Sequence, residues 1–177
     1  MFTLYIDADS CPKNLRTILL RCIVKNDYAA FFVADRPLKD VQTAYEQHTA
    51  KLRKEAEAQG FEDVRSVTSK IENVVVEADM DSADNWIVDN AVLPCLAVTH
   101  DIPLAARLVE KDIPTIDDRG GVFTKESMAQ RLSIRNAMKE FREMGIFSEK
   151  HKPMGPKETK AFSDALNTML HKLTVKQ

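Results

Sequence analysis

Long apolar runs are absent from this sequence of 177 residues. No stretch of about 18 apolar residues occurs, which is close to the least that a membrane-spanning helix needs. The N-terminus, MFTLYIDADS, has neither a basic segment nor a small-residue cleavage site. We therefore expect a cytoplasmic protein with no membrane partner.

Cysteine, glycine and proline are also scarce. The three cysteines, Cys11, Cys22 and Cys95, lack the CxxC or Cys/His spacing of a zinc site, so buried reduced thiols are expected. With 5 Gly, 7 Pro and 44% hydrophobic residues, the composition excludes a disordered or fibrous chain. A chain of this length buries enough surface to fold without disulfides. We predict one domain over residues 1–177, with a core at about 1–124 and a C-terminal helical extension at about 125–177.

Charge is divided unevenly along the chain. Residues 1–124 carry 14 Lys/Arg against 21 Asp/Glu, whereas residues 125–177 carry 11 against 6. A basic region beside an acidic body favours contact with nucleic acid, because Lys and Arg provide most of the non-specific affinity for a phosphate backbone. A solvated helical surface explains the same pattern equally well.

Apolar, β-rich runs alternate with segments of helical periodicity. The pattern predicts strands at 2–8, 28–34, 74–78, 95–99 and 114–116. It predicts helices at 10–25, 39–59, 81–92, 103–111, 125–144 and 157–173. This order is typical of an α/β fold with a central, mostly parallel sheet flanked by helices, in which ligands bind beyond the carboxyl ends of the strands.

Acidic residues follow three of the predicted strands. Asp7 lies at the end of the first predicted strand, and Asp101 and the pair Asp117 and Asp118 each lie just past a strand end. On neighbouring parallel strands these carboxylates would point into one crevice and repel one another unless a cation neutralised them. Oxygen ligands alone favour Mg²⁺ or Mn²⁺ over zinc.

Three further aspartates have two interpretations. Asp81 and Asp84 lie three residues apart at a helix start and share nearly the same face, so both are candidate ligands of one ion. Taken alone, capping is the simpler explanation, because Asp81 or Ser82 suits an N-cap and the helix dipole favours a carboxylate in the first turn. Asp9 has the same ambiguity, whereas Asp7 comes too early to cap a helix.

Polar and basic residues near these strand ends are candidate substrate contacts. His100 is a candidate base, although a single histidine at a strand end is more often a surface residue. Thr99 either orients a ligand or fills a β position. The nearest basic residues either clamp phosphate or pair with neighbouring acids, and they are Arg36, Arg107 and Arg119.

Several strings resemble the YaiI/YqxD family of uncharacterised bacterial proteins: IDADSCP, VADRPL, DSADNWIV, VTHDIPLAARLVEK and DDRGG, followed by FTKESMAQRLSIRNAMKEFREMG. That family is similar to PIN-domain nucleases, so the resemblance implies a three-layer PIN-like fold. It implies metal-site roles for Asp7, Asp84, Thr99 and Asp101, with Asp117 as a weaker fourth acid. Two departures stand out, because residues 40–70 are longer than the family pattern and the usual N-P-R-G turn reads DDRG at 117–120.

These residues support three functional hypotheses. The first is a Mg²⁺- or Mn²⁺-dependent nuclease or phosphodiesterase acting on RNA or other single-stranded nucleic acid, with Asp7, Asp84 and Asp101 as catalytic residues. The second is a phosphatase of the haloacid-dehalogenase type, because an Asp7-Ala8-Asp9 pattern after a strand suits its nucleophile and acid/base, and Lys111 follows in a compatible order. The third is a non-catalytic metal- or nucleic-acid-binding protein. A homo-oligomer is compatible with all three.

Overall fold

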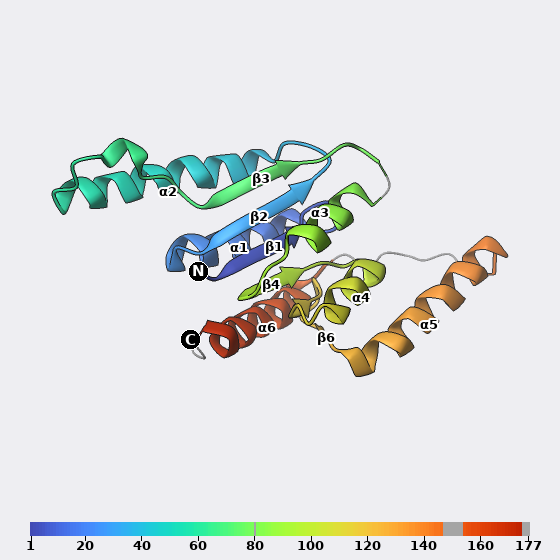
Figure 1. The fold of residues 1–177 in the computed structure, drawn as a ribbon. Coiled ribbons are helices and arrows are strands. Elements are labelled where there is room, and N and C mark those ends of the chain that lie inside the picture. The colour runs from blue at the N-terminus through green and yellow to red at the C-terminus, as the bar shows by residue number, and fades with distance from the viewer. Residues whose placement is uncertain (80, 147–153, 175–177) are drawn as a thin grey trace.

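The structure is a computed structural model that describes residues 1–79, 81–146 and 154–174, and its centre is a six-stranded sheet. In chain order the strands are β1 (Thr3–Asp7), β2 (Ala29–Ala34), β3 (Ile71–Val75), β4 (Cys95–Val98), β5 (Thr115–Ile116) and β6 (Val122–Phe123). In space they follow the order β3-β2-β1-β4-β5-β6 (Figure 1). All neighbouring strands pair in parallel except β5 and β6, which are antiparallel. The expectation of a mostly parallel α/β sheet is confirmed.

Helices follow most strands and flank the sheet. They are α1 (Lys13–Asn26), α2 (Lys39–Ala58), α3 (Ser82–Asn90), α4 (Ile102–Glu110), α5 (Lys125–Glu143) and α6 (Pro156–Thr174), with a short 3-10 helix, η1 (Val64–Ser66). Each predicted helix is present with its ends shifted by at most a few residues. Helix α1 begins three residues later than predicted, with Pro12 at its capping position.

Helices α1, α2 and α6 cover one face of the sheet. Ile6 of β1 and Phe32 of β2 point to this face and pack with Leu19 of α1, Val41 of α2 and Phe162 of α6. All five side chains are almost completely buried. Helix α6 therefore belongs to the main hydrophobic core, although it comes from the region expected to be an extension.

Helices α3 and α4 cover the opposite face. Tyr5 of β1 and Ala97 of β4 point to it and pack with Ile87 of α3 and Leu104 of α4. Side chains alternate between the two faces along a strand. Asp7, two residues after Tyr5, is therefore directed to the same side of the sheet as α3 and α4, at the carboxyl end of β1.

One strand was predicted at the wrong position and one was missed. Strand β3 begins at Ile71, before the predicted strand at 74–78, and it also ends earlier. Buried Ile71 pairs with Ala30, and the side chain of Asn73 bonds to the backbone of Phe32 and Leu38. Because a polar residue at the edge of the sheet makes these hydrogen bonds, the start of the strand shows no run of apolar residues in the sequence. The two-residue strand β6 is too short for its periodicity to be recognised.

The three cysteines carry free thiols. Cys11 and Cys95 are buried free thiols and Cys22 is partly buried. Burial raises the pKa of Cys11 to about 12 and that of Cys95 to about 11, so both thiols stay protonated.

Within the described residues, no helix is both long enough and apolar enough to cross a membrane.

Candidate functional site

A side-chain hydrogen bond joins the carboxyl ends of β1 and β4. The Thr99 hydroxyl donates to Asp7 Oδ2 at 2.7 Å, and both residues are buried. The same hydroxyl accepts a hydrogen bond of 2.9 Å from the Asp101 amide. Thr99 therefore links the side chain of Asp7 to the backbone of Asp101.

Asp84 approaches these acids from the first turn of α3, which packs against β1. Burial, and then the negative charges of Asp101 and Asp7, raise the pKa of Asp84 from 3.8 to about 7. Helix α3 packs against both β1 and α4, and Asp101 caps α4, so Asp7, Asp84 and Asp101 lie in one region of the structure. The nearby Arg107 lowers the same pKa and donates a hydrogen bond of 2.9 Å to Asn85.

The donor set suits a hard divalent cation, because it consists of carboxylate oxygens that repel one another. A bound cation would favour the ionised form of Asp84. Among the residues that the structure describes, however, no three acidic, histidine or cysteine side chains already lie close enough together to hold a metal ion. The site thus fits Mg²⁺ or Mn²⁺ in its chemistry, without a set of ligands assembled in advance.

Asp81 lies at the capping position of α3 but does not cap it. Its backbone is left-handed, with φ of 65°, and its side chain makes no capping hydrogen bond. The charge of Asp81 instead contributes to the raised pKa of Asp84. The capping explanation therefore fails for Asp81, whereas Asp101 does cap α4 by accepting a 2.8 Å hydrogen bond from the Leu104 amide.

Asp9 and Arg36 face each other at the end of β2, beside the other acids. One oxygen of Asp9 accepts a 2.9 Å hydrogen bond from the Asp35 amide, and the other lies 3.1 Å from Arg36. Burial raises the pKa of Asp9. Asp9 therefore ties the loop before α2 to the loop after β1, and Arg36 is engaged with Asp9 and Asp35.

Asp117 is occupied within its own loop. Its Oδ1 accepts hydrogen bonds from the amides of Arg119 and Gly121, at 2.8 and 2.6 Å, and its Oδ2 lies 3.3 Å from Arg131. These contacts shape the turn between β5 and β6. The structure therefore gives Asp117 a loop-forming role and does not bring it into the group of Asp7, Asp84 and Asp101.

Ser10 and Asp118 form contacts that connect the loops around the acids. These contacts were not predicted from the sequence. The Ser10 hydroxyl donates to the Asp7 carbonyl at 3.3 Å and accepts from the His100 amide at 3.2 Å. Asp118 lies 2.8 Å from His100 Nδ1, and this contact raises the pKa of the imidazole. Both residues lie in strings that resemble the family, IDADS and DDRGG, and this position was the indication in the sequence that they belong near the site.

Helix α5 forms one wall of a cavity that opens beside Asp101. The cavity has a volume of about 350 Å³. Ser10, His100 and Asp101 line it from the loops, and Arg135 and Arg142 line it from α5. Both arginines are on the same face of α5, since they lie seven residues apart. Part of the basic charge of the C-terminal region is therefore beside the acidic loops.

Comparison with known proteins identifies the family. Residues 58–172 match the model described as "Uncharacterized BCR, YaiI/YqxD family". The chain belongs to the YaiI/YqxD family. Its relatives include a UPF0178 protein of Psychromonas ingrahamii, 36% identical over 170 residues that cover 96% of each chain. A UPF0178 protein of Myxococcus xanthus is 35% identical over 96% of this chain and 95% of its own.

These YaiI/YqxD relatives extend over nearly the whole chain. UPF0178 protein PSEEN5341 of Pseudomonas entomophila is 30% identical and also aligns over 96% of both chains. The greater length of residues 40–70 relative to the family pattern stays a prediction. No solved structure matches the chain significantly.

Proposed function

We propose that this YaiI/YqxD protein is a Mg²⁺- or Mn²⁺-dependent phosphodiesterase that hydrolyses RNA or another single-stranded nucleic acid. The observation that carries the proposal is the set of acids at the carboxyl edge of the sheet, where the Thr99 hydroxyl links Asp7 to the backbone of Asp101. Burial, and then the charges of Asp101 and Asp7, raise the pKa of Asp84 beside them to about 7. The resemblance of the family to PIN-domain nucleases supports the same function.

Each acid has a defined part in this proposal. Asp7, Asp84 and Asp101 would hold the cation, and Thr99 keeps the carboxylate of Asp7 in place by its 2.7 Å hydrogen bond. When bound, a divalent cation activates water and stabilises charge on the leaving oxygen of a phosphodiester. Asp81 adds negative charge to the same region, and the nearby Arg107 limits the repulsion at Asp84.

The wall formed by α5 would bind the substrate backbone. Arg135 and Arg142 line the cavity beside Asp101, and guanidinium groups bind phosphate with directed hydrogen bonds. Ile134 and Met138 line the same cavity and add apolar surface next to the arginines. A nucleic acid strand that crosses this wall would bring a phosphodiester to the acids.

The phosphatase hypothesis receives less support from the structure. Its expected lysine, Lys111, follows the last residue of α4 and donates a hydrogen bond to the carbonyl of Val88. It therefore lies at the opposite end of α4 from Asp101. Asp9 is also paired with Arg36, so it is poorly placed to exchange a proton with a phosphate group on Asp7.

The proposal is tested by incubating the purified protein with labelled single-stranded RNA and Mn²⁺. We expect cleavage by the wild-type protein and at least about a hundredfold loss in Asp7→Asn, because one ligand of the cation is removed. Asp89→Asn is a matched control, since Asp89 is an exposed aspartate on α3. Equal cleavage by wild type and Asp7→Asn would disprove the assignment.

A further inference from the structure

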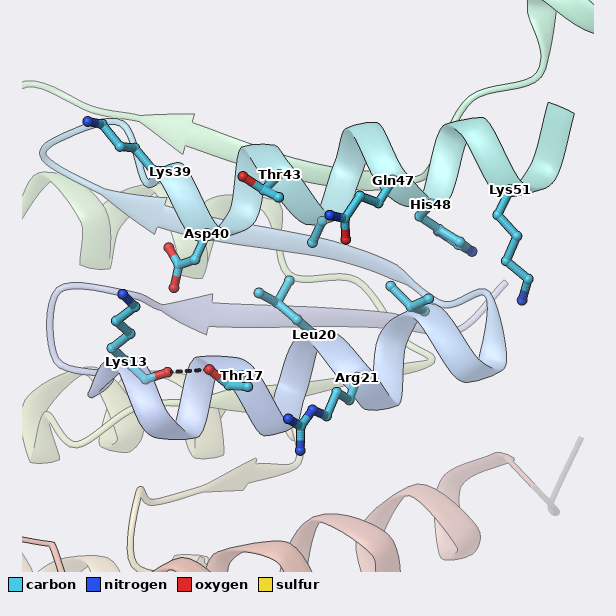
Figure 2. Close-up of a pocket in the computed structure, with 12 residues that line it drawn as sticks. Lys13, Thr17, Leu20, Arg21, Lys39, Asp40, Thr43, Gln47, His48 and Lys51 are labelled. Atoms are coloured by element: carbon cyan, nitrogen blue, oxygen red, sulfur yellow. Dashed lines mark hydrogen bonds between the residues drawn. The ribbon is translucent and has the colours of Figure 1, made fainter. Parts of the chain in front are cut away.

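A second cavity lies between α1 and α2, on the sheet face opposite α3 and α4. Its volume is about 670 Å³, which is within the range of small-molecule sites. Figure 2 shows the two helices side by side, with Lys13 and Lys39 toward one end and His48 and Lys51 toward the other. The residues of the metal-site hypothesis take no part in this groove.

The middle of the groove is apolar, with polar groups along one side. Leu20 and Val24 of α1 and Ala44 of α2 line it. Gln47 and His48 of α2 also line it, and the buried His48 ring is held by a 3.0 Å contact with Ser69 outside the cavity. Such a surface suits a flat organic group that has a few hydrogen-bonding atoms.

One end of the groove carries two lysines, Lys13 and Lys39, and one aspartate, Asp40, which Figure 2 shows between them. Lys13 and Lys39 are the first residues of α1 and α2, where each lysine is disfavoured by the positive end of its own helix dipole. An anion between them would be attracted by both ammonium groups and by both helix ends. The acid in the lining, Asp40, is paired with Arg16 at 3.0 Å, so its charge is largely compensated.

We propose that this groove binds a nucleoside monophosphate. The phosphate lies between Lys13 and Lys39, and the nucleoside rests on the apolar surface of Leu20 and Ala44. A mononucleotide matches both parts of the groove, because it combines one dianionic group with a flat base that has hydrogen-bonding edges. The site is separate from the proposed phosphodiesterase centre and does not depend on that activity.

The test is a titration of the ¹⁵N-labelled full chain with adenosine monophosphate, followed by NMR in the presence of EDTA. We expect the amide signals of residues lining the groove to shift, with a dissociation constant below about 1 mM. The double variant Lys13→Gln/Lys39→Gln should bind at least about tenfold more weakly, because two charged hydrogen bonds are lost. Lys25→Gln/Lys54→Gln is the matched control, since it removes the same charge from exposed positions of the same two helices.

Several results would overturn the proposal. One is the absence of shifts in the groove at millimolar nucleotide, and another is a set of shifts confined to the loops around Asp7 and Asp101. Inorganic phosphate binding as tightly as the nucleotide would show that the groove recognises an anion without a nucleoside. Displacement of the nucleotide by a polyglutamate peptide at micromolar concentration would instead identify a protein interface. Because EDTA removes divalent cations, failure of RNA cleavage and failure of this site remain distinguishable.

Discussion

At the scale of single residues, the surroundings of Asp84 link the site to stability. Its pKa is raised to about 7 in the folded chain from an ordinary 3.8. The folded state therefore holds the proton more tightly than the unfolded state, and the contribution of Asp84 to stability falls as pH rises from about 4 through about 7. The site is destabilising at neutral pH when no cation neutralises it.

Removing this carboxylate should stabilise the protein in the absence of metal. We expect Asp84→Asn to raise the Tm at pH 8 by about 2–4 °C, which corresponds to about 1 kcal/mol after allowance for solvent screening. At pH 4 the two proteins should melt alike, because Asp84 is then protonated. Calorimetry in EDTA at both pH values checks this, with Asp89→Asn as the control. A lower Tm for Asp84→Asn at pH 8 would contradict it.

His100 provides a second prediction for a single residue. The 2.8 Å contact with Asp118 raises the pKa of His100 above 6.5, so the pair stabilises the fold below that pH and loses its effect as pH rises through the raised value. Asp118→Asn should return the pKa toward 6.5, as followed by NMR titration of the ring protons. Asp112→Asn, at an exposed aspartate, should leave the titration unchanged.

At the scale of elements, the turn between β5 and β6 holds α6 in place. Gly120 has φ of 85°, and a Cβ atom there would lie 2.5 Å from the carbonyl oxygen of Ala161 in α6. Glycine is thus required both for the backbone conformation and for the close approach of the helix. The Asp117 carboxylate, which accepts from the Gly121 amide at 2.6 Å, stabilises the same turn.

Two glycine substitutions separate these effects. Gly120→Ala should destabilise the protein by at least about 3 kcal/mol, because strain and the clash with α6 add. Gly60→Ala should cost only about 1–2 kcal/mol, because Gly60 also has a positive φ but no atom lies within 4 Å of its added Cβ. Urea denaturation measures both values. Equal losses would mean that α6 moves away without cost.

The periodicity of apolar residues in the sequence predicts some helices and strands but not others. Helix α1 and strand β1 were predicted because their buried residues repeat at regular intervals. The start of β3 was not, since Glu72 and Asn73 occupy an edge strand where Asn73 bonds to the neighbouring backbone. The absence of a capping hydrogen bond from Asp81 could not be predicted either, because it follows from a left-handed backbone in place of the capping conformation.

At the scale of the whole molecule, the parallel sheet explains which of the candidate residues lie near one another. Asp7 and Asp101 were expected to meet because their strands end at one edge, and Thr99 joins them. Asp9 and Asp117 follow the same rule of position but bond to loop partners, Arg36 and Arg131. Sequence spacing identifies the edge on which a residue lies, whereas the direction of its side chain depends on loop contacts.

Metal binding should be visible as stabilisation of the whole domain. A cation at a hundred times its dissociation constant adds about 2.7 kcal/mol, so millimolar Mn²⁺ should raise the Tm of the wild-type protein by roughly 5–10 °C. The increase should be lost in Asp7→Asn and retained in Asp89→Asn. An identical Tm with Mn²⁺ and with EDTA would argue against a metal site and favour a non-catalytic binding protein.

The hydrogen bond between Thr99 and Asp7 joins the two central strands of the sheet at the point where the proposed chemistry occurs. Substitutions that loosen the packing of β1 against β4 would therefore be felt first as a loss of precision at the acids, before the chain unfolds. Variants far from the carboxylates could be inactive while still folded, and a screen for solubility alone would overlook them.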